Sequence, residues 1–266
     1  MVKVKDITAI IEEFAPLALQ QSYDNSGLVV GRYDNPVSGV LLAVDVTVEV
    51  LQEAIDMGAN MVITHHPIIF NPVKRFNSSN YVEVAVEMAI KNDINLYACH
   101  TNLDSVEGGT SWYLADKLGV KGLSVMQPSN RGDIANSGFG VVGEFERDYS
   151  FDEVMNNISQ SVGVEAIKHS RVVDKPIRRV ALCTGSGGSL MGEAIEAEVD
   201  LYITSDLRYN DFMTPDNRFT VIDIGHFESE YCAIDILYDV LSKKMLIFAP
   251  RKSLSSSNPV HYWVKG

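Results

Sequence analysis

The sequence predicts an α/β protein made of two similar three-layer α/β/α lobes that arose by internal duplication. Short apolar runs alternate with amphipathic segments along most of the chain, a pattern typical of a mostly parallel sheet with helices on both faces. The pattern recurs at a spacing of 140 residues, where Glu53–Asp56 matches Glu193–Glu196 and Asn60–Thr64 matches Asp200–Thr204. We interpret these matches as a duplication. The alternative is that any two α/β units share some resemblance.

A further match pairs His100 with His226 and Asp104 with Glu230, at a spacing of 126 residues. The shorter spacing predicts that the second lobe has lost about one helix between its second and third strands. If the lobes are related by a pseudo-twofold axis, both pairs could face one cleft.

The first lobe is assigned to residues 1–125. Leu41–Val44 is a continuous apolar run, as expected for a strand that is buried on both faces. Thr47 suits the N-cap and Gly58 the C-terminal cap of the helix that follows. By such criteria we expect strands at 41–44, 61–63 and 94–99, and helices at 48–58, 82–91 and 110–118.

The second lobe is assigned to residues 126–266, and its C-terminal segment is expected to pack back on the first lobe. Residues 127–133 have the composition of a polar linker, and residues 253–259 that of a flexible loop. Asp152 and Glu153 suit the first turn of a helix. We expect strands at 139–145, 180–183, 201–203, 221–224 and 260–264, and helices at 151–162, 190–198 and 228–243.

Composition narrows the class of protein. The 266 residues are 46% hydrophobic, which is enough for a sizeable core, and no apolar run approaches the roughly 20 residues that span a bilayer. The N-terminus lacks the apolar region of a signal peptide, and three scattered cysteines form no disulfide framework. We therefore expect a cytoplasmic protein. Its net charge of -13 argues against binding to nucleic acid.

Four of the six histidines directly follow predicted buried strands, and two of these four precede a carboxylate by four residues. In a parallel α/β sheet, ligands bind beyond the carboxyl ends of the strands. Imidazole and carboxylate groups gathered there are suitable donors for metal ions. The pattern predicts a two-metal hydrolase with these candidate residues: His65, His66, His100, Asp104, His226 and Glu230.

The spacing of these residues suggests separate roles. Neighbouring residues on an extended strand point to opposite faces, so His65 and His66 are expected to serve two metals or two roles. If a helix begins near His226, Glu230 lies on the same helical face, one turn later. Glu228 then points elsewhere and is expected to cap the helix or support the ligands.

Each feature also has a simpler structural interpretation. Taken alone, His226 would be a buried, hydrogen-bonded histidine, and Asp104 a turn residue or N-cap. Cys183 is better explained as a small core residue than as a catalytic thiol. The turn Thr184–Ser189 could hold phosphate through backbone N–H groups, but it lacks the lysine of a Walker loop.

Four segments resemble the signature segments of the Nif-three-like family, whose members are often labelled GTP cyclohydrolase 1 type 2 homologues. They are Thr64–Pro67, His100–Asp104, Gly185–Gly188 and Gly225–Glu230. Residues 23–31 resemble the family's N-terminal motif, in which a Trp usually stands in place of Tyr23. The resemblance extends from about residue 6 to residue 266.

The resemblance implies a dinuclear site with a bridging carboxylate. Carried over by motif, the ligands of two divalent metal ions (Zn, Fe, Mn or Ni) would be His65, His66, Asp104, His226 and Glu230. His100 matches a histidine that lines the same cleft, and we expect His100 and Glu228 to move protons. The resemblance further implies a toroidal homohexamer and a small-molecule substrate of the nucleotide or phosphoester class.

Two positions depart from the family pattern. Ser205 stands where Gly is usual, and Asn210 stands where His is usual. If that His takes part in proton transfer, this protein has lost it or has moved the role to His100. The departure motivates an alternative function, a noncatalytic metal-binding scaffold or protein-interaction ring.

Overall fold

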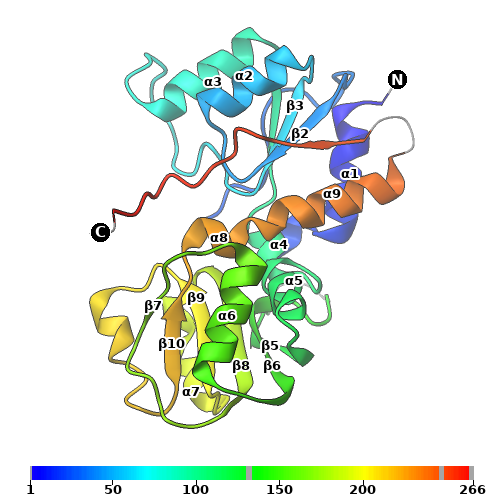
Figure 1. Cartoon of the computed structure of the whole chain (residues 1–266). Coiled ribbons are helices and arrows are strands. Elements are labelled where there is room, and N and C mark those ends of the chain that lie inside the picture. Colours follow the sequence, from blue (N-terminus) through cyan, green and yellow to red (C-terminus); the bar gives the residue numbers. More distant parts are fainter. Residues whose placement is uncertain (1, 130–133, 246–248, 264–266) are drawn as a thin grey trace. The chain divides into compact units, whose positions relative to one another are not determined.

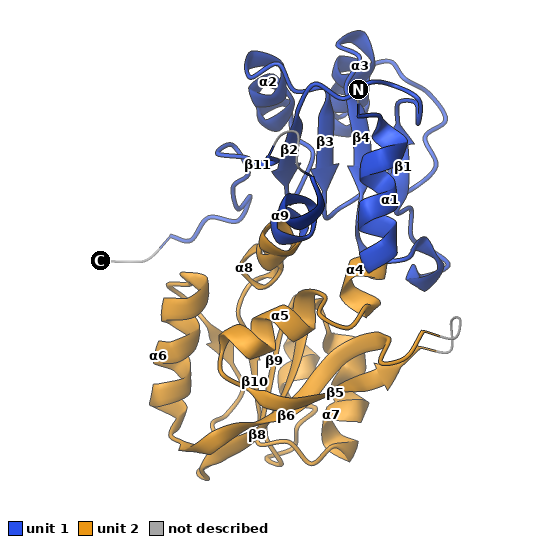
Figure 2. Ribbon diagram, turned by 90° about the vertical axis from the view of Figure 1, so that its right-hand side faces the viewer, with its two compact units in different colours: residues 1–100, 237–266 blue, residues 101–236 orange. Residues whose placement is uncertain are grey.

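The computed structural model describes residues 2–129, 134–245 and 249–263 (Figure 1). The chain forms two compact units, one of residues 1–100 with 237–266 and the other of residues 101–236 (Figure 2). The chain therefore passes from one unit to the other at 100/101 and again at 236/237, whereas the sequence pattern placed a single boundary at 125/126. Both units are mixed α/β, as the sequence predicts.

Unit 1 contains a five-stranded sheet. Its strands lie in the order β1 (Gly27–Val30), β4 (Asn95–Ala98), β3 (Met61–Thr64), β2 (Val40–Ala43) and β11 (Arg251–Lys252). All neighbours pair in parallel except β1, which pairs antiparallel to β4. Every residue of β2, β3 and β4 is buried, which explains why their sequences are apolar apart from Thr64 and Asn95.

Helices cover both faces of this sheet. The helices α2 (Val48–Asp56) and α3 (Tyr81–Lys91) pack against one face through a shared apolar cluster. The helix α1 (Val4–Phe14) and the unit 1 part of α9 (Cys232–Lys244) lie on the other face (Figure 2). The hydroxyl of Thr47 accepts a hydrogen bond from Val50 N at 3.2 Å, so the predicted N-cap of α2 is confirmed.

The C-terminal segment differs from its prediction. The predicted strand at 260–264 is wrong for the described residues 260–263, which lie in no strand, and residue 264 is outside the described part. The segment before it, predicted to be a flexible loop, is held by Glu53. This carboxylate accepts hydrogen bonds from Ser253 Oγ at 2.6 Å and from the backbone N–H groups of Leu254 and Ser255 at 3.0 Å.

Unit 2 contains a six-stranded sheet. Its strands lie in the order β5 (Lys121–Pro128), β6 (Gly138–Tyr149), β8 (Ile177–Ser186), β9 (Leu201–Ser205), β10 (Thr220–Asp223) and β7 (Lys168–His169). The central strands β8, β9 and β10 are parallel, and the outer strands pair antiparallel. The first two residues of the predicted linker 127–133 end β5, and residues 130–133 lie outside the described part.

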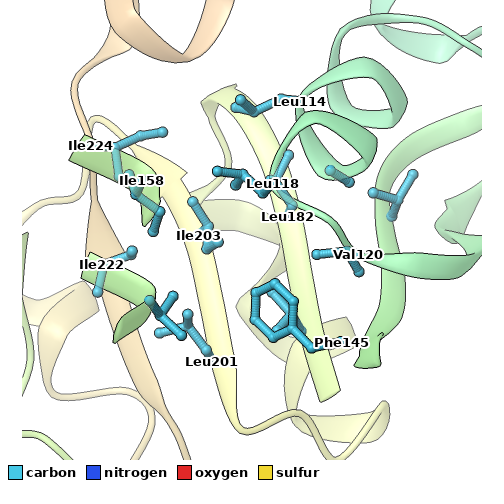
Figure 3. Packing of buried hydrophobic residues seen from close by; sticks show 14 of the residues in the cluster. Leu114, Leu118, Val120, Phe145, Ile158, Leu182, Leu201, Ile203, Ile222 and Ile224 are labelled. Atoms are coloured by element: carbon cyan, nitrogen blue, oxygen red, sulfur yellow. The ribbon is translucent and has the colours of Figure 1, made fainter. Parts of the chain in front are cut away.

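The main core of unit 2 lies between this sheet and two helices, α5 (Thr110–Lys117) and α6 (Phe151–Val162) (Figure 3). A second cluster packs α7 (Met191–Glu196) against the other face. The helix expected at 190–198 is a 3-10 turn, η2 (Gly188–Leu190), followed by α7. The single helix expected at 228–243 is two helices, α8 (His226–Glu230) and α9, interrupted at Tyr231. Two short elements complete the unit: α4 (Thr101–Ser105) and η3 (Tyr209–Phe212).

The strand registers of the two sheets fit the proposed duplication. Leu41 pairs with Val62 between β2 and β3, and Ala181 pairs with Tyr202 between β8 and β9. Both pairs repeat at the 140-residue spacing seen in the sequence. The two units therefore share a parallel pair of strands with the same residue-by-residue register.

The third strand of each unit reveals a one-residue difference. Ile63 pairs with Tyr97 in unit 1, and Ile203 pairs with Ile222 in unit 2, so the strands correspond at a spacing of 125. The histidines beyond them correspond at 126, so unit 2 carries one extra residue between strand and histidine. Gly225 lies in this stretch with φ of 88°, a conformation that residues with a side chain rarely adopt.

None of the described helices is long and apolar enough to cross a membrane.

Candidate metal centre

Unit 1 brings three histidines together at the carboxyl ends of two adjacent strands. His65 and His66 follow β3, and His100 follows β4. The ring centroids are 5.0 Å apart for His65 and His66, 5.2 Å for His65 and His100, and 5.4 Å for His66 and His100. One ring nitrogen from each histidine lies within 4.8 Å of the other two. This is close enough for the three nitrogens to share one ion.

The Nδ1 atoms of the β3 histidines both face oxygen acceptors. His65 Nδ1 lies 2.9 Å from the carbonyl oxygen of Cys99, and His66 Nδ1 lies 2.8 Å from Asp45 Oδ1. A carbonyl oxygen can only accept, so the neutral His65 ring carries its proton on Nδ1 and a lone pair on Nε2. Metal-binding histidines are commonly oriented in this way, with Nε2 as the ligand atom.

His100 is held by a buried carboxylate. Its Nδ1 lies 2.7 Å from Oδ1 of Asp24, whose side chain is fully buried. Asp24 also accepts hydrogen bonds from Ser26 Oγ at 2.9 Å and from Asn25 N at 2.7 Å. The sequence analysis did not single out Asp24 or Asp45. The usable signals were the position of Asp24 in the 23–31 motif and that of Asp45 just after a buried strand.

Unit 2 pairs a histidine with a carboxylate on one helical turn. His226 begins α8, and its Nε2 lies 2.8 Å from Glu230 Oε2, as the four-residue spacing predicts. Its Nδ1 lies 2.7 Å from Asp206 Oδ2. Burial lowers the pKa of His226, but the hydrogen bonds and charges of Glu230 and Asp206 outweigh it and raise the pKa to about 9. The two carboxylates thus favour a positive charge here, which a metal ion bound to Nε2 would also supply.

Asp104 and Glu230 lie near the same two buried thiols. Burial, and next the charges of Asp104 and Glu230, raise the pKa of Cys183 to about 12. Burial and the same two carboxylates also raise the pKa of Cys232. Cys183 therefore remains a neutral thiol, which supports its interpretation as a core residue. Asp104 is positioned in turn by Thr110, whose Oγ1 donates to Oδ1 at 2.6 Å.

The glycine-rich turn makes room for the carboxylate of Glu230. A Cβ at Gly185 would lie 2.1 Å from Glu230 Oε1, and the backbone there has φ of +63°. The N–H of Gly185 donates to Ser229 Oγ at 2.9 Å, and that of Gly187 donates to Thr204 Oγ1 at 3.0 Å. Because these N–H groups already have partners, the turn is a poor phosphate cradle.

Glu228 turns back toward the start of α8. A Cβ at Gly225 would lie 2.2 Å from Glu228 Oε2, so the carboxylate covers that glycine. This position agrees with a role in capping or support. Asn210, the departure from the usual family histidine, is exposed in η3.

Comparisons with known proteins agree along nearly the whole chain. The model of the Duf34/NIF3 (NGG1p interacting factor 3) family matches residues 2–254. The GTP cyclohydrolase 1 type 2 homolog of Clostridium perfringens is 36% identical over 231 residues, 86% of this chain and 87% of that protein. That of Clostridium acetobutylicum is 35% identical over 245 residues, 91% of this chain and 89% of that protein.

Solved structures show the same similarity. A hypothetical protein of Staphylococcus aureus superposes with a TM-score of 0.89 at 25% identity, over 98% of this chain and 99% of that chain. Reduced HcgD from Methanocaldococcus jannaschii superposes with a TM-score of 0.79 at 26% identity, over 96% of this chain and 98% of that chain.

Proposed function

The chain belongs to the Duf34/NIF3 family, and on this premise we propose that it binds two divalent metal ions and acts as a metal-dependent hydrolase. The observation that carries the proposal is the cluster of His65, His66 and His100, whose candidate ligand nitrogens lie within 4.8 Å of one another. Nδ1 of each ring faces an oxygen atom, which leaves Nε2 suited to bind a cation.

The proposed ligands from unit 2 are Asp104, His226 and Glu230, which would add carboxylate and imidazole donors to the site. Asp104 follows His100 by only four residues along the chain. A helix advances about 6 Å over that length. Glu230 shares the surroundings of Asp104 within unit 2, since both charges act on the same buried thiols.

Two bound divalent ions would lower the pKa of a coordinated water and polarise the bond to be cleaved. The chain's own part is to orient the ligands, through Asp24, Asp45 and Asp206, and to carry protons. We assign proton transfer to Glu228, whereas His100 has two candidate roles, proton carrier and metal ligand, which the metal content of a His100 variant separates. The relatives named GTP cyclohydrolase 1 type 2 homologs favour a nucleotide or another phosphoester as substrate.

Metal content tests the ligand set directly. Protein purified without chelator is analysed by mass spectrometry for metal per chain, as wild type, Glu230→Ala and Glu165→Ala. Glu165 is exposed, so its variant controls for the loss of one carboxylate. We expect about two metals in the wild type and the control, and fewer in Glu230→Ala. Absence of metal from the wild type, even after supplementation with Zn, Mn and Fe, would refute the ligand set.

His100 has two candidate roles, and the same measurement separates them. A proton carrier replaced by Gln leaves the metals bound and lowers turnover. A ligand replaced by Gln lowers metal content itself. We expect His100→Gln to lose metal, because its ring centroid lies 5.2 Å and 5.4 Å from those of His65 and His66, nearly as close as the 5.0 Å between those two.

A noncatalytic scaffold is the second candidate function, and Asn210 in place of the usual family histidine favours it. The hydrolase is tested by turnover of the metal-loaded protein on a panel of nucleotides and phosphoesters. Two bound metals without turnover on the panel would favour the scaffold. So would a Glu230→Ala variant that keeps both its oligomeric state and its cellular phenotype.

We further propose that the protein is a cytoplasmic homohexamer with a toroidal shape. Its three cysteines, all within the described residues, are buried and form no disulfide, which suits a reducing compartment. Light scattering coupled to size-exclusion chromatography measures the assembly, and a monomeric mass would contradict it.

A further inference from the structure

A long loop follows the histidines of β3 and forms a cavity beside them. Residues 65–80 connect β3 to α3, and the cavity, of about 920 Å³, is lined entirely by residues from Pro67 to Glu83. Its size lies in the range of small-molecule sites. The ring of Phe70, which lines it, stands 6.1 Å from that of His100 in an edge-on arrangement. The cavity therefore opens next to the proposed metal ligands of unit 1.

The loop is basic in an acidic protein. Residues 67–82 contain Lys74 and Arg75 and no Asp or Glu, whereas the chain as a whole has a net charge of -13. Both side chains line the cavity and are exposed. Among the described residues, neither has an ion-pair or hydrogen-bond partner, unlike Lys3, Lys5, Lys91 and Lys244 of the same unit. Their charges are therefore available to a ligand.

The one carboxylate in the lining is used to shape the loop. Glu83 accepts hydrogen bonds from Asn77 N at 3.0 Å, from Ser79 N at 2.9 Å and Oγ at 3.0 Å, and from Asn80 Nδ2 at 2.9 Å. These bonds satisfy both carboxylate oxygens, and those from the backbone lower the pKa of Glu83. Glu83 thus holds the loop in place and does not pair with the two cations.

An exposed aromatic ring completes the lining. Tyr81, the first residue of α3, is 72% exposed, and Phe70 is 43% exposed. Such rings stack with planar ligands and lose little conformational entropy in doing so. The lining therefore offers aromatic faces and two cations at the mouth of a site that would hold metal ions.

We propose that this cavity, which we call the loop subsite, binds the anionic group of an aromatic substrate, with Lys74 and Arg75 contacting a phosphate or a carboxylate. This proposal rests on the proposed hydrolase function, because the bound molecule is a substrate only if the protein is a hydrolase. Arg and Lys form charge-assisted hydrogen bonds with both kinds of anion. The ring of the ligand would lie against Phe70 and Tyr81, which directs the remainder of the molecule toward the histidines.

The test measures binding of phenyl phosphate, benzoate, inorganic phosphate and phenol to the full-length chain by calorimetry. Metal is removed beforehand with a chelator that is then separated from the protein, so the anion cannot bind through metal. We expect the Lys74→Ala/Arg75→Ala variant to bind the tighter of the two aromatic anions about tenfold more weakly than wild type. The control Arg171→Ala/Arg218→Ala removes the same charge from exposed loops of unit 2 and should change the affinity less than about twofold.

The comparison of phenyl phosphate with benzoate identifies the anionic group. Replacement of Tyr81 by Leu should weaken the binding of phenyl phosphate and leave the binding of inorganic phosphate unchanged. Tyr209→Leu, at another exposed tyrosine, should change neither affinity. The proposal is overturned if the Lys74/Arg75 variant binds as wild type does, or if phenol binds as tightly as phenyl phosphate. Metal content of the same variant is measured in parallel, so the loss of the loop subsite is distinguished from failure of the metal site.

Discussion

Replacement of Gly185 by Ala should remove one metal ligand without unfolding the protein. The added Cβ would lie 2.1 Å from Glu230 Oε1 and 3.1 Å from its Cδ, whereas ordinary contacts begin at 3.4 Å. The carboxylate must therefore move by at least about 1 Å, and metal–ligand distances tolerate only about 0.2 Å. His226 Cε1 would lie at 3.7 Å, an ordinary contact, so the imidazole can stay in place.

The cost in stability has two parts that matched variants separate. Alanine at a φ of +63° costs about 1–2 kcal/mol, whatever surrounds it. Gly163 has φ of +74°, and an added methyl group would meet nothing within 4 Å, so Gly163→Ala isolates this backbone cost. Gly192 lies inside α7 with open space, so Gly192→Ala should be neutral or slightly stabilising. Urea denaturation of the metal-free proteins measures all three.

The decisive assay is metal per chain after loading and desalting. We expect Gly185→Ala to lose about one metal, and Gly163→Ala and Gly192→Ala to retain the wild-type content. If Gly185→Ala binds metal with unchanged stoichiometry and affinity, then Glu230 is not a ligand in the position described. Gly185 would then not be needed to make room for a ligand.

Three further predictions concern other parts of the structure. Asp24→Asn should weaken metal binding about 10- to 100-fold in competition with a chromophoric chelator, because it loosens His100. Asp34→Asn, on the surface, should leave the metal affinity unchanged. Equal metal affinities of Asp24→Asn and the wild type would contradict the role of Asp24. Ser150→Ala removes the N-cap of α6 and should lower the free energy of unfolding in urea by about 1 kcal/mol. A change near zero would contradict this capping role. Burial raises the pKa of Glu53, but its hydrogen bonds lower it further, to below 4.5, so its stabilising effect is present above that pH and is lost as the pH falls. Glu53→Gln should therefore lower Tm at pH 7 and have progressively less effect as the pH falls below about 4.5, and an effect independent of pH would contradict this.

The sequence predicted those elements whose pattern is local. Four-residue runs such as β2 and β3 are buried on both faces, so nearly every position is apolar, the buried Thr64 being the exception. The strand β5 was not anticipated, because it is an edge strand that is exposed at five of its eight positions. The strand β11 has two residues, and its partner β2 lies about 210 residues earlier in the chain. No local pattern could indicate that pairing.

The candidate site shows the same contrast between features set by local sequence and features set by tertiary structure. Histidines at strand ends could be found from sequence, because a buried apolar run marks the end of each strand. Their oxygen partners could not, because the pairing is decided by tertiary structure. Asp24 lies 76 residues before His100, and Asp206 lies 20 residues before His226. The sequence therefore identified the candidate metal ligands better than the residues that orient them.

The two units place different chemistry on equivalent positions. At the 140-residue spacing, His66 at the end of β3 corresponds to Asp206 at the end of β9. His66 offers an imidazole, which Asp45 orients, whereas Asp206 orients the imidazole of His226. Unit 1 thus supplies mainly nitrogen donors and unit 2 mainly carboxylates. A duplicated scaffold whose strand ends are fixed by register can diverge in this way, because a change of residue beyond the strand leaves the buried pairing untouched. If the units arose by duplication, the proposed mixed set of imidazole and carboxylate ligands would be a product of that divergence, and mixed sets accept several divalent metals.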